Sequence, residues 1–137
     1  MTVRMELTDE MKLGVRAIDS EHQELIDLGN RFLDSAESGA SNANLTAALD
    51  EMIASARRHF LDEEQLLDRN GYPSLAAHKA DHHRLLSEAE TLRGHLTTAG
   101  EDAHHLALEA AVYLRSWLVD HILTADKPYR PFLMRLA

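Results

Sequence analysis

The chain has 137 residues, of which 45% are hydrophobic and 5% aromatic, and its formal net charge at pH 7 is −9. This length suits one domain with a buried core, and the acidic balance argues against nucleic acids and anionic membrane surfaces as partners, since both require a basic patch. The chain has no cysteine, which excludes disulfides and thiolate metal sites. The first residues lack the apolar segment of a signal peptide and no membrane-spanning run follows, so we expect an unexported, cytoplasmic protein.

Residues 1–18 have no helical or strand period, and we expect an N-terminal arm that packs across the domain. The first helix is predicted to begin at Ser20, because Ser20 and Gln23 have the spacing of a capping box. A histidine occupies this helix's apolar stripe, where a leucine would be expected. The stripe consists of His22, Leu25, Ile26, Gly29, Phe32, Leu33 and Ala36.

Three further amphipathic segments follow the first helix. They are expected over about 44–69, from about residue 74, and after a loop near residue 100, each with an apolar stripe of helical period. Short loops rich in turn-forming residues separate them. Four amphipathic helices with short connections predict an all-α, up-down-up-down four-helix bundle. The expected organisation is a single domain over 1–137, with an arm at 1–18, a bundle over about 19–126 and a tail at 127–137 that packs back on the bundle.

Polar side chains interrupt the inner stripes at one height of this bundle. Residues four apart share a face of a helix, and distances counted from the loops place one set in a single layer: His22, His59, Glu63, His78, His82 and His121. A single buried histidine is as often a core residue with a backbone partner as a ligand. Several unpaired groups at roughly 1–3 kcal/mol each would cancel much of a domain stability of about 5–15 kcal/mol. A metal centre is therefore predicted.

Asp126, five residues after His121, is predicted to complete the ligand set. In an ideal α-helix a spacing of five lies about 140° from the starting face. Asp126 can therefore point inward only if the last helical turn tightens or widens.

Two further pairs with ligand-like spacing are expected to be solvated surface residues. His105 with Glu109, and Glu101 with His104, also have ligand-like spacing, but both pairs lie at the beginning of the fourth helix, far from the ligand layer. His83 points away from the face of His82, and His95 lies near a helix end. Neither is predicted to bind metal.

Taken together, these residues resemble the hemerythrin family in its bacterial single-domain form. The resemblance covers about residues 13–129 and departs at Leu7, where the family often has tryptophan. Its motifs are Ile18-Asp19-Ser20-Glu21-His22, His59-Phe60-x-x-Glu63-Glu64, Gly71-Tyr72-Pro73 followed by His78-x-x-x-His82, and Trp117-Leu118-x-x-His121-Ile122-x-x-x-Asp126-x-x-Tyr129.

The resemblance implies a non-haem di-iron centre with a bridging oxo or hydroxo group. It implies that His78, His82 and His121 bind one iron, that His22 and His59 bind the other, and that Glu63 and Asp126 bridge both. The second iron would then keep an open position for a diatomic ligand. Neighbouring apolar residues are predicted to keep the ligand pocket dry, and no inner-stripe residue is placed to donate a proton. These lining residues are Leu25, Ile26, Phe60, Leu114 and Leu118.

The function expected from this resemblance is reversible O2 binding for carriage, storage or delivery, without a catalytic residue. A di-iron oxidase, a peroxidase or a nitric oxide-handling protein is the enzymatic alternative. A sensor of O2, redox state or iron is a third class, and a bundle that holds structural zinc is the least favoured. Expected partners are O2, nitric oxide or another small ligand, and a protein that receives the oxygen.

Overall fold

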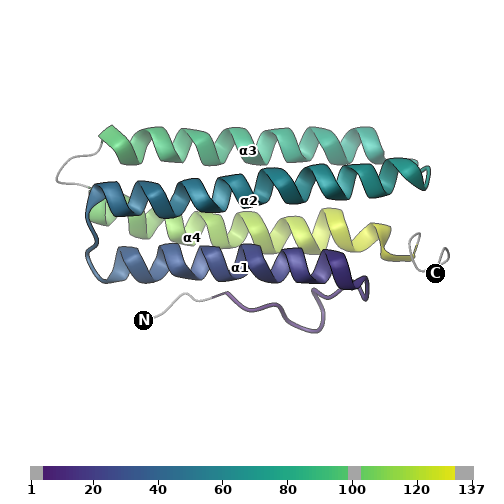
Figure 1. The fold of residues 1–137 in the computed structure, drawn as a ribbon, viewed down its shortest axis with the longest axis horizontal. Helices are drawn as coiled ribbons and strands as arrows, with labels where there is room; N and C mark the ends of the chain where they lie inside the picture. The colour runs from purple at the N-terminus through teal and green to yellow at the C-terminus, as the bar shows by residue number, and fades with distance from the viewer. Residues whose placement is uncertain (1–4, 99–102, 132–137) are drawn as a thin grey trace.

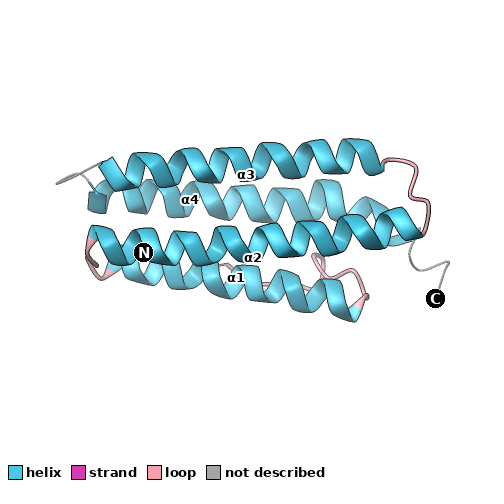
Figure 2. Ribbon diagram, turned by 45° about the horizontal axis from the view of Figure 1, so that its top comes forward, coloured by secondary structure: helices cyan, strands magenta, loops and turns pink. Residues whose placement is uncertain are grey.

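The computed structural model describes residues 5–98 and 103–131, which form a bundle of four antiparallel helices (Figures 1 and 2). The helices are α1 (Arg16–Glu37), α2 (Asn42–Arg69), α3 (Leu75–Thr98) and α4 (Ala103–His121). A π-helical turn, η2 (Ile122–Asp126), and a 3-10 turn, η3 (Lys127–Tyr129), follow α4. The predicted all-α four-helix bundle is confirmed.

The first helix begins a turn earlier than the sequence predicted. It starts at Arg16, so Ser20 lies inside α1 and does not cap it. Asp19, in the first turn, holds the preceding loop in place. Its carboxylate accepts hydrogen bonds from the backbone N–H groups of Leu13 at 2.8 Å and Gly14 at 3.0 Å. The prediction of a start at Ser20 was wrong, because the hydrogen bonds of Asp19 with Leu13 and Gly14 stabilise a helix that begins earlier.

The end of α4 widens, as an inward-pointing Asp126 requires. Residues 122–126 form the π-helical turn, in which backbone hydrogen bonds join residues five apart. The five-residue spacing between His121 and Asp126 therefore keeps both side chains on the inner face. Both are buried, and an Asp126 oxygen lies 3.0 Å from Nε2 of His121.

Two apolar clusters enclose the buried polar layer. The larger one combines residues of all four helices, among them Leu25, Phe60, Leu85 and Leu118. The smaller one covers the end of the bundle that carries the α2–α3 turn, and it consists of Leu13, Ile18, Leu67 and Tyr129. Apolar side chains therefore separate the polar layer from water along the bundle axis.

One buried side chain attaches the N-terminal arm to α1, beside which the arm runs in Figure 1. The Asn30 side chain accepts a hydrogen bond from the Met5 N–H at 2.7 Å and donates one to the Met5 carbonyl at 2.9 Å. Met5 and Met11 are buried in the larger cluster, and Leu7 packs against it. The arm is thus part of the core, with Leu7 in contact.

Replacing Asn30 by alanine should lower the free energy of unfolding by about 1–3 kcal/mol, because two hydrogen bonds worth about 0.5–1.5 kcal/mol each are lost. Urea denaturation at fixed metal content measures the change. Gln23→Ala is the matched control, since the Gln23 amide lies on the exposed face of α1 and bonds Asp27 of the same helix. Equal stabilities of the two variants would contradict a role for Asn30.

The end of the chain was expected to pack back on the bundle. Tyr129 does so, with no exposed surface. Phe132, Leu133 and Met134, also part of the expected tail, lie outside the described residues. Over the ranges that the structure describes, no helix is long and apolar enough to cross a membrane.

Candidate metal centre

The seven side chains predicted as ligands converge at one level of the bundle, and each is at most 5% exposed. Their nitrogen and oxygen atoms form two groups, within each of which these atoms lie no more than 4.8 Å from one another. The first group contains Glu63, His78, His82, His121 and Asp126, and the second contains His22, His59, Glu63 and Asp126. Glu63 and Asp126 belong to both groups.

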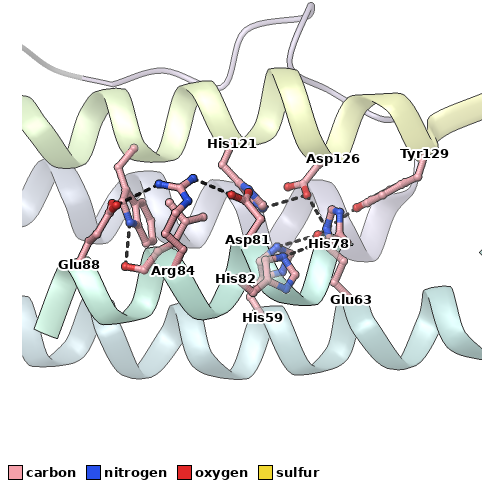
Figure 3. Close-up of polar contacts among 12 residues, drawn as sticks. His59, Glu63, His78, Asp81, His82, Arg84, Glu88, His121, Asp126 and Tyr129 are labelled. Carbon is pink, nitrogen blue, oxygen red and sulfur yellow. Dashed lines mark hydrogen bonds and ion pairs between the residues drawn. The ribbon is translucent and has the colours of Figure 1, made fainter. Parts of the chain in front are cut away.

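Glu63 lies between histidines of three helices, and Figure 3 shows those of α2 and α3. Its Oε1 makes a short contact with Nε2 of His78 and lies 3.0 Å from Nε2 of His82. Its Oε2 lies 3.1 Å from Nε2 of His59 and 3.8 Å from Nε2 of His22. One carboxylate therefore faces both histidine groups.

Asp126 provides a second shared carboxylate from the π-helical turn. Its Oδ2 lies 3.0 Å from Nε2 of His22, which is in the two-histidine group. Its Oδ1 lies 3.0 Å from Nε2 of both His78 and His121, in the three-histidine group. Two carboxylates shared in this way are what a bridge between two metal ions requires.

The chemistry of these donors fits metal ions. Several buried donor atoms lack a hydrogen-bond partner among the described residues: Nε2 of His22, His59, His82 and His121, and both oxygens of Asp126. An unsatisfied buried group costs about 1–3 kcal/mol. Imidazole nitrogens together with carboxylate oxygens bind divalent transition metals. A metal would therefore satisfy the atoms that the protein itself leaves without partners.

Without metal, His59 and His78 retain protons at neutral pH. Burial by itself lowers the pKa of His59, but the hydrogen bond with Glu21 and the nearby Glu63 carboxylate outweigh it and raise the pKa to about 10. Burial likewise opposes the shift at His78, where Asp126 and Glu63 raise the pKa to about 9. Burial also raises the pKa of the Glu63 and Asp126 carboxyls, yet the surrounding histidines hold both below their ordinary values.

Metal binding at pH 7 is consequently expected to release at least two protons per chain, one each from His59 and His78. A raised pKa keeps the proton on the imidazole up to that pH, and the proton competes with the metal for the ring nitrogen. Metal affinity should therefore increase with pH and level off above about pH 9 to 10. Calorimetric titration in buffers with different ionisation enthalpies measures the number of protons. A binding enthalpy that is the same in every buffer would contradict this expectation.

Three carboxylates outside the predicted ligand set each contact one of the ligand histidines at Nδ1, while Nε2 of the ring faces the other candidate ligands. Each accepts the Nδ1 hydrogen of one ring: Glu21 from His59 at 2.6 Å, Glu64 from His82 at 2.7 Å and Asp81 from His121 at 2.7 Å. No role was predicted for these residues from the sequence. A signal was present, since each carboxylate directly adjoins a predicted ligand in the chain.

Tyr129 belongs to the last motif of the resemblance, but no role was predicted for it from the sequence. Its hydroxyl donates a hydrogen bond to Oε2 of Glu63 at 3.0 Å, and its ring lies 5.6 Å from that of His78. Burial and the nearby Glu63 and Asp126 carboxylates raise the pKa of Tyr129, so the phenol keeps its proton. Tyr129 lies in η3, beyond the helical stripes from which the sequence predicts inward-pointing groups.

Phe60 lies against three of the candidate ligands. Its ring stacks on His82, with centroids 3.9 Å apart and an interplanar angle of 6°. It also lies 5.8 Å from the ring of His59 and 5.6 Å from that of His121. The other predicted lining residues, each at most 2% exposed in the same apolar cluster, are Leu25, Ile26, Leu114 and Leu118. That these residues line a ligand pocket stays a prediction.

The histidines that were not predicted to bind metal are on the surface. His83, His95, His104 and His105 are all exposed. His105 pairs with Glu109 at 2.9 Å, with side chains that are 80% and 63% exposed. Glu101, the remaining member of the two pairs at the start of α4, lies outside the described residues.

Known proteins share both the sequence and this architecture. The family model described as the hemerythrin HHE cation binding domain matches residues 13–133. A bacteriohemerythrin of Methylococcus capsulatus is 30% identical over 124 residues, covering 90% of this chain and 92% of that protein. A myohemerythrin of Sipunculus nudus is 29% identical over 122 residues, covering 89% and 88%.

The fold agrees with these matches. The crystal structure of a wild-type hemerythrin superimposes with a TM-score of 0.83 at 30% identity, covering 95% of this chain and 97% of that one. The family model, the relatives and the fold all indicate the family that the ligand motifs predicted. This chain belongs to the hemerythrin family.

Proposed function

We propose that this protein holds two iron ions, with a bridging oxo or hydroxo group, and binds O2 reversibly at one of them. The observation that carries the proposal is the unequal division of donors around two shared carboxylates. One group offers three imidazoles and the other only two. The ion in the two-histidine group, with His22 and His59, therefore has room for a small ligand such as O2 or nitric oxide.

The proposed assignment gives each side chain of the centre one task. When bound, the two iron ions supply the electrons that O2 takes up and returns. Glu63 and Asp126 hold the two ions together, since each faces both histidine groups. The histidines bind them individually: His78, His82 and His121 on one side, and His22 and His59 on the other.

The apolar surroundings favour release of the ligand over its reduction. Reducing O2 further requires protons, and a site that excludes water supplies few of them. Phe60 covers three histidine rings, and the other proposed lining residues are buried in the same cluster. The Tyr129 phenol contacts Glu63, but its hydrogen is already donated to that carboxylate and its pKa is raised.

Tyr129 is also the observation that supports an enzymatic alternative. A phenol that touches a candidate bridging carboxylate is a source of hydrogen close to the metal. In a di-iron oxidase or peroxidase such a group would supply hydrogen to reduced oxygen. Nitric oxide handling and sensing of O2 or iron would use the same open position.

Anaerobic reduction of the iron-loaded protein, exposure to air and then degassing test the proposal. Near-ultraviolet and visible spectra should show a charge-transfer band that forms with O2 and disappears when O2 is removed. An O2 electrode should record stoichiometric uptake followed by return. Irreversible oxidation, or continued consumption of O2 in the presence of a reductant, would overturn the carrier function in favour of an enzyme or sensor.

A further inference from the structure

Three candidate histidine ligands are held by a carboxylate from the preceding helix. Glu21 of α1 contacts His59 of α2, Glu64 of α2 contacts His82 of α3, and Asp81 of α3 contacts His121 of α4. The same type of contact thus repeats at three consecutive seams of the bundle. Figure 3 shows the last of them, with Asp81 behind His121.

The local sequence explains this repetition. Glu21 directly precedes His22, Glu64 follows Glu63, and Asp81 precedes His82. One residue along an α-helix corresponds to a rotation of about 100°. When a ligand points into the bundle, its neighbour therefore points sideways, toward the next helix and the ring that this helix contributes.

Among the described residues, no carboxylate of α4 contacts Nδ1 of a histidine of α1 at the fourth seam. Nδ1 of His22 is buried without a hydrogen-bond partner among the described residues. The acidic neighbour of His121 is Asp120, which lines a hollow of about 220 Å³ together with Asp81 and Arg84 of α3. Asp120 thus lies on the α3 side of α4. At this seam, His22 therefore has no carboxylate at Nδ1 among the described residues.

Asp81 is itself fixed by a surface network (Figure 3). Arg84 donates hydrogen bonds to Asp81 at 2.6 Å and to Glu88 at 3.0 Å, and the Tyr113 hydroxyl donates to Glu88. One oxygen of Asp81 thus faces Arg84 while the other accepts from His121. The carboxylate cannot turn without breaking one of these contacts.

We propose that Glu21, Glu64 and Asp81 are positioning residues of the metal centre. By accepting the Nδ1 hydrogen, each keeps its histidine in the tautomer whose Nε2 lone pair faces the metal. Glu64 and Asp81 then set the affinity of the three-histidine group, and Glu21 sets that of the two-histidine group. The inference rests on the proposed function only in requiring that both groups bind metal.

Titration of the metal-free full chain with Zn²⁺, in competition with a chromophoric chelator, measures both affinities. The wild type should bind two ions, one for each group. Glu64→Ala and Asp81→Ala should weaken one dissociation constant, and Glu21→Ala the other, each by about 10- to 100-fold. Asp81→Asn, which keeps an acceptor oxygen, should recover much of the loss. If Asp81→Ala does not fold, Asp81→Leu removes the acceptor at similar volume.

Two carboxylates that connect helices without touching a histidine provide matched controls. Glu90 pairs with Arg57 across α2 and α3 at 2.6 Å, and Glu51 pairs with Arg31 across α1 and α2 at 3.2 Å. Glu90→Ala and Glu51→Ala should leave both zinc affinities unchanged. They remove a charge and an interhelical contact, as the test variants do, but they leave every ring nitrogen with its partner.

Nitrogen-15 NMR of the imidazoles in the zinc-loaded protein supplies a readout that general destabilisation would not change. His59, His82 and His121 should carry the proton on Nδ1, and Asp81→Ala should alter the signals of His121 alone. Test variants that bind zinc like the controls, with unaltered imidazole signals, would overturn the inference. A wild-type chain that fails to bind two zinc ions would instead overturn the two-metal centre.

Discussion

Glu63→Gln is expected to reduce metal binding from two ions per chain to one or none. Glu63 is a member of both donor groups, and its two oxygens face four different histidines. Glutamine has nearly the same size, but its amide nitrogen cannot act as a ligand, so the bridge is lost. Metal analysis after loading with excess Fe²⁺ and desalting, all without oxygen, measures the stoichiometry.

The same variant should also be less stable without metal, by about 3–5 kcal/mol, because it leaves buried protonated histidines without their counter-charge. Glu109→Gln is the matched control: Glu109 also follows a histidine by four residues, but this pair is exposed. The control should retain both metal ions and full stability. A Glu63→Gln protein with two tightly held ions would exclude Glu63 as a bridge.

Phe60→Ala is expected to have the second-largest effect. Removal of a buried phenylalanine typically costs about 3–5 kcal/mol, through lost burial and the cavity left behind. This cavity would lie beside the rings of His59, His82 and His121. Water could then reach the centre, and reversible O2 uptake should give way to faster irreversible oxidation. Chemical denaturation and the decay of the O2-dependent absorption band measure the two effects.

Phe32→Ala separates the two consequences of this substitution. Phe32 has no exposed surface and belongs to the same apolar cluster, but it lies ten residues beyond His22 on α1. The loss of stability should be similar, while the band should decay at the wild-type rate. Equal decay rates in the two variants would mean that Phe60 does not protect the centre from water.

Much of the centre could be predicted because its spacing is local. His59 and Glu63, like His78 and His82, are one helical turn apart, and such pairs share a face whatever the helix packs against. Distances counted from the turn at Gly71 then placed these pairs at one height, where the structure has them. Asp126 was predicted only on condition that the helix end changed, and the π-helical turn meets that condition.

The residues missed by sequence reasoning make contacts between distant parts of the chain. Glu21 and His59 are 38 residues apart, Asp81 and His121 are 40 apart, and Tyr129 and Glu63 are 66 apart. Their side chains meet only because neighbouring helices pack against each other in one particular orientation about their own axes. An acidic residue beside a ligand has many orientations open to it in isolation, so helical period alone does not identify its partner.

The ligand motifs already resembled those of the hemerythrin family, and the sequence by itself determined four amphipathic helices with a histidine layer within their apolar stripes. Hydrophobic period and residues one helical turn apart contain that information. Only the tertiary structure decided the earlier start of α1, the widened turn before Asp126, the carboxylates behind three histidines and the phenol on Glu63. Each of these depends on a backbone adjustment or a contact between separate elements, and the energy of such a contact exists only once the helices have packed.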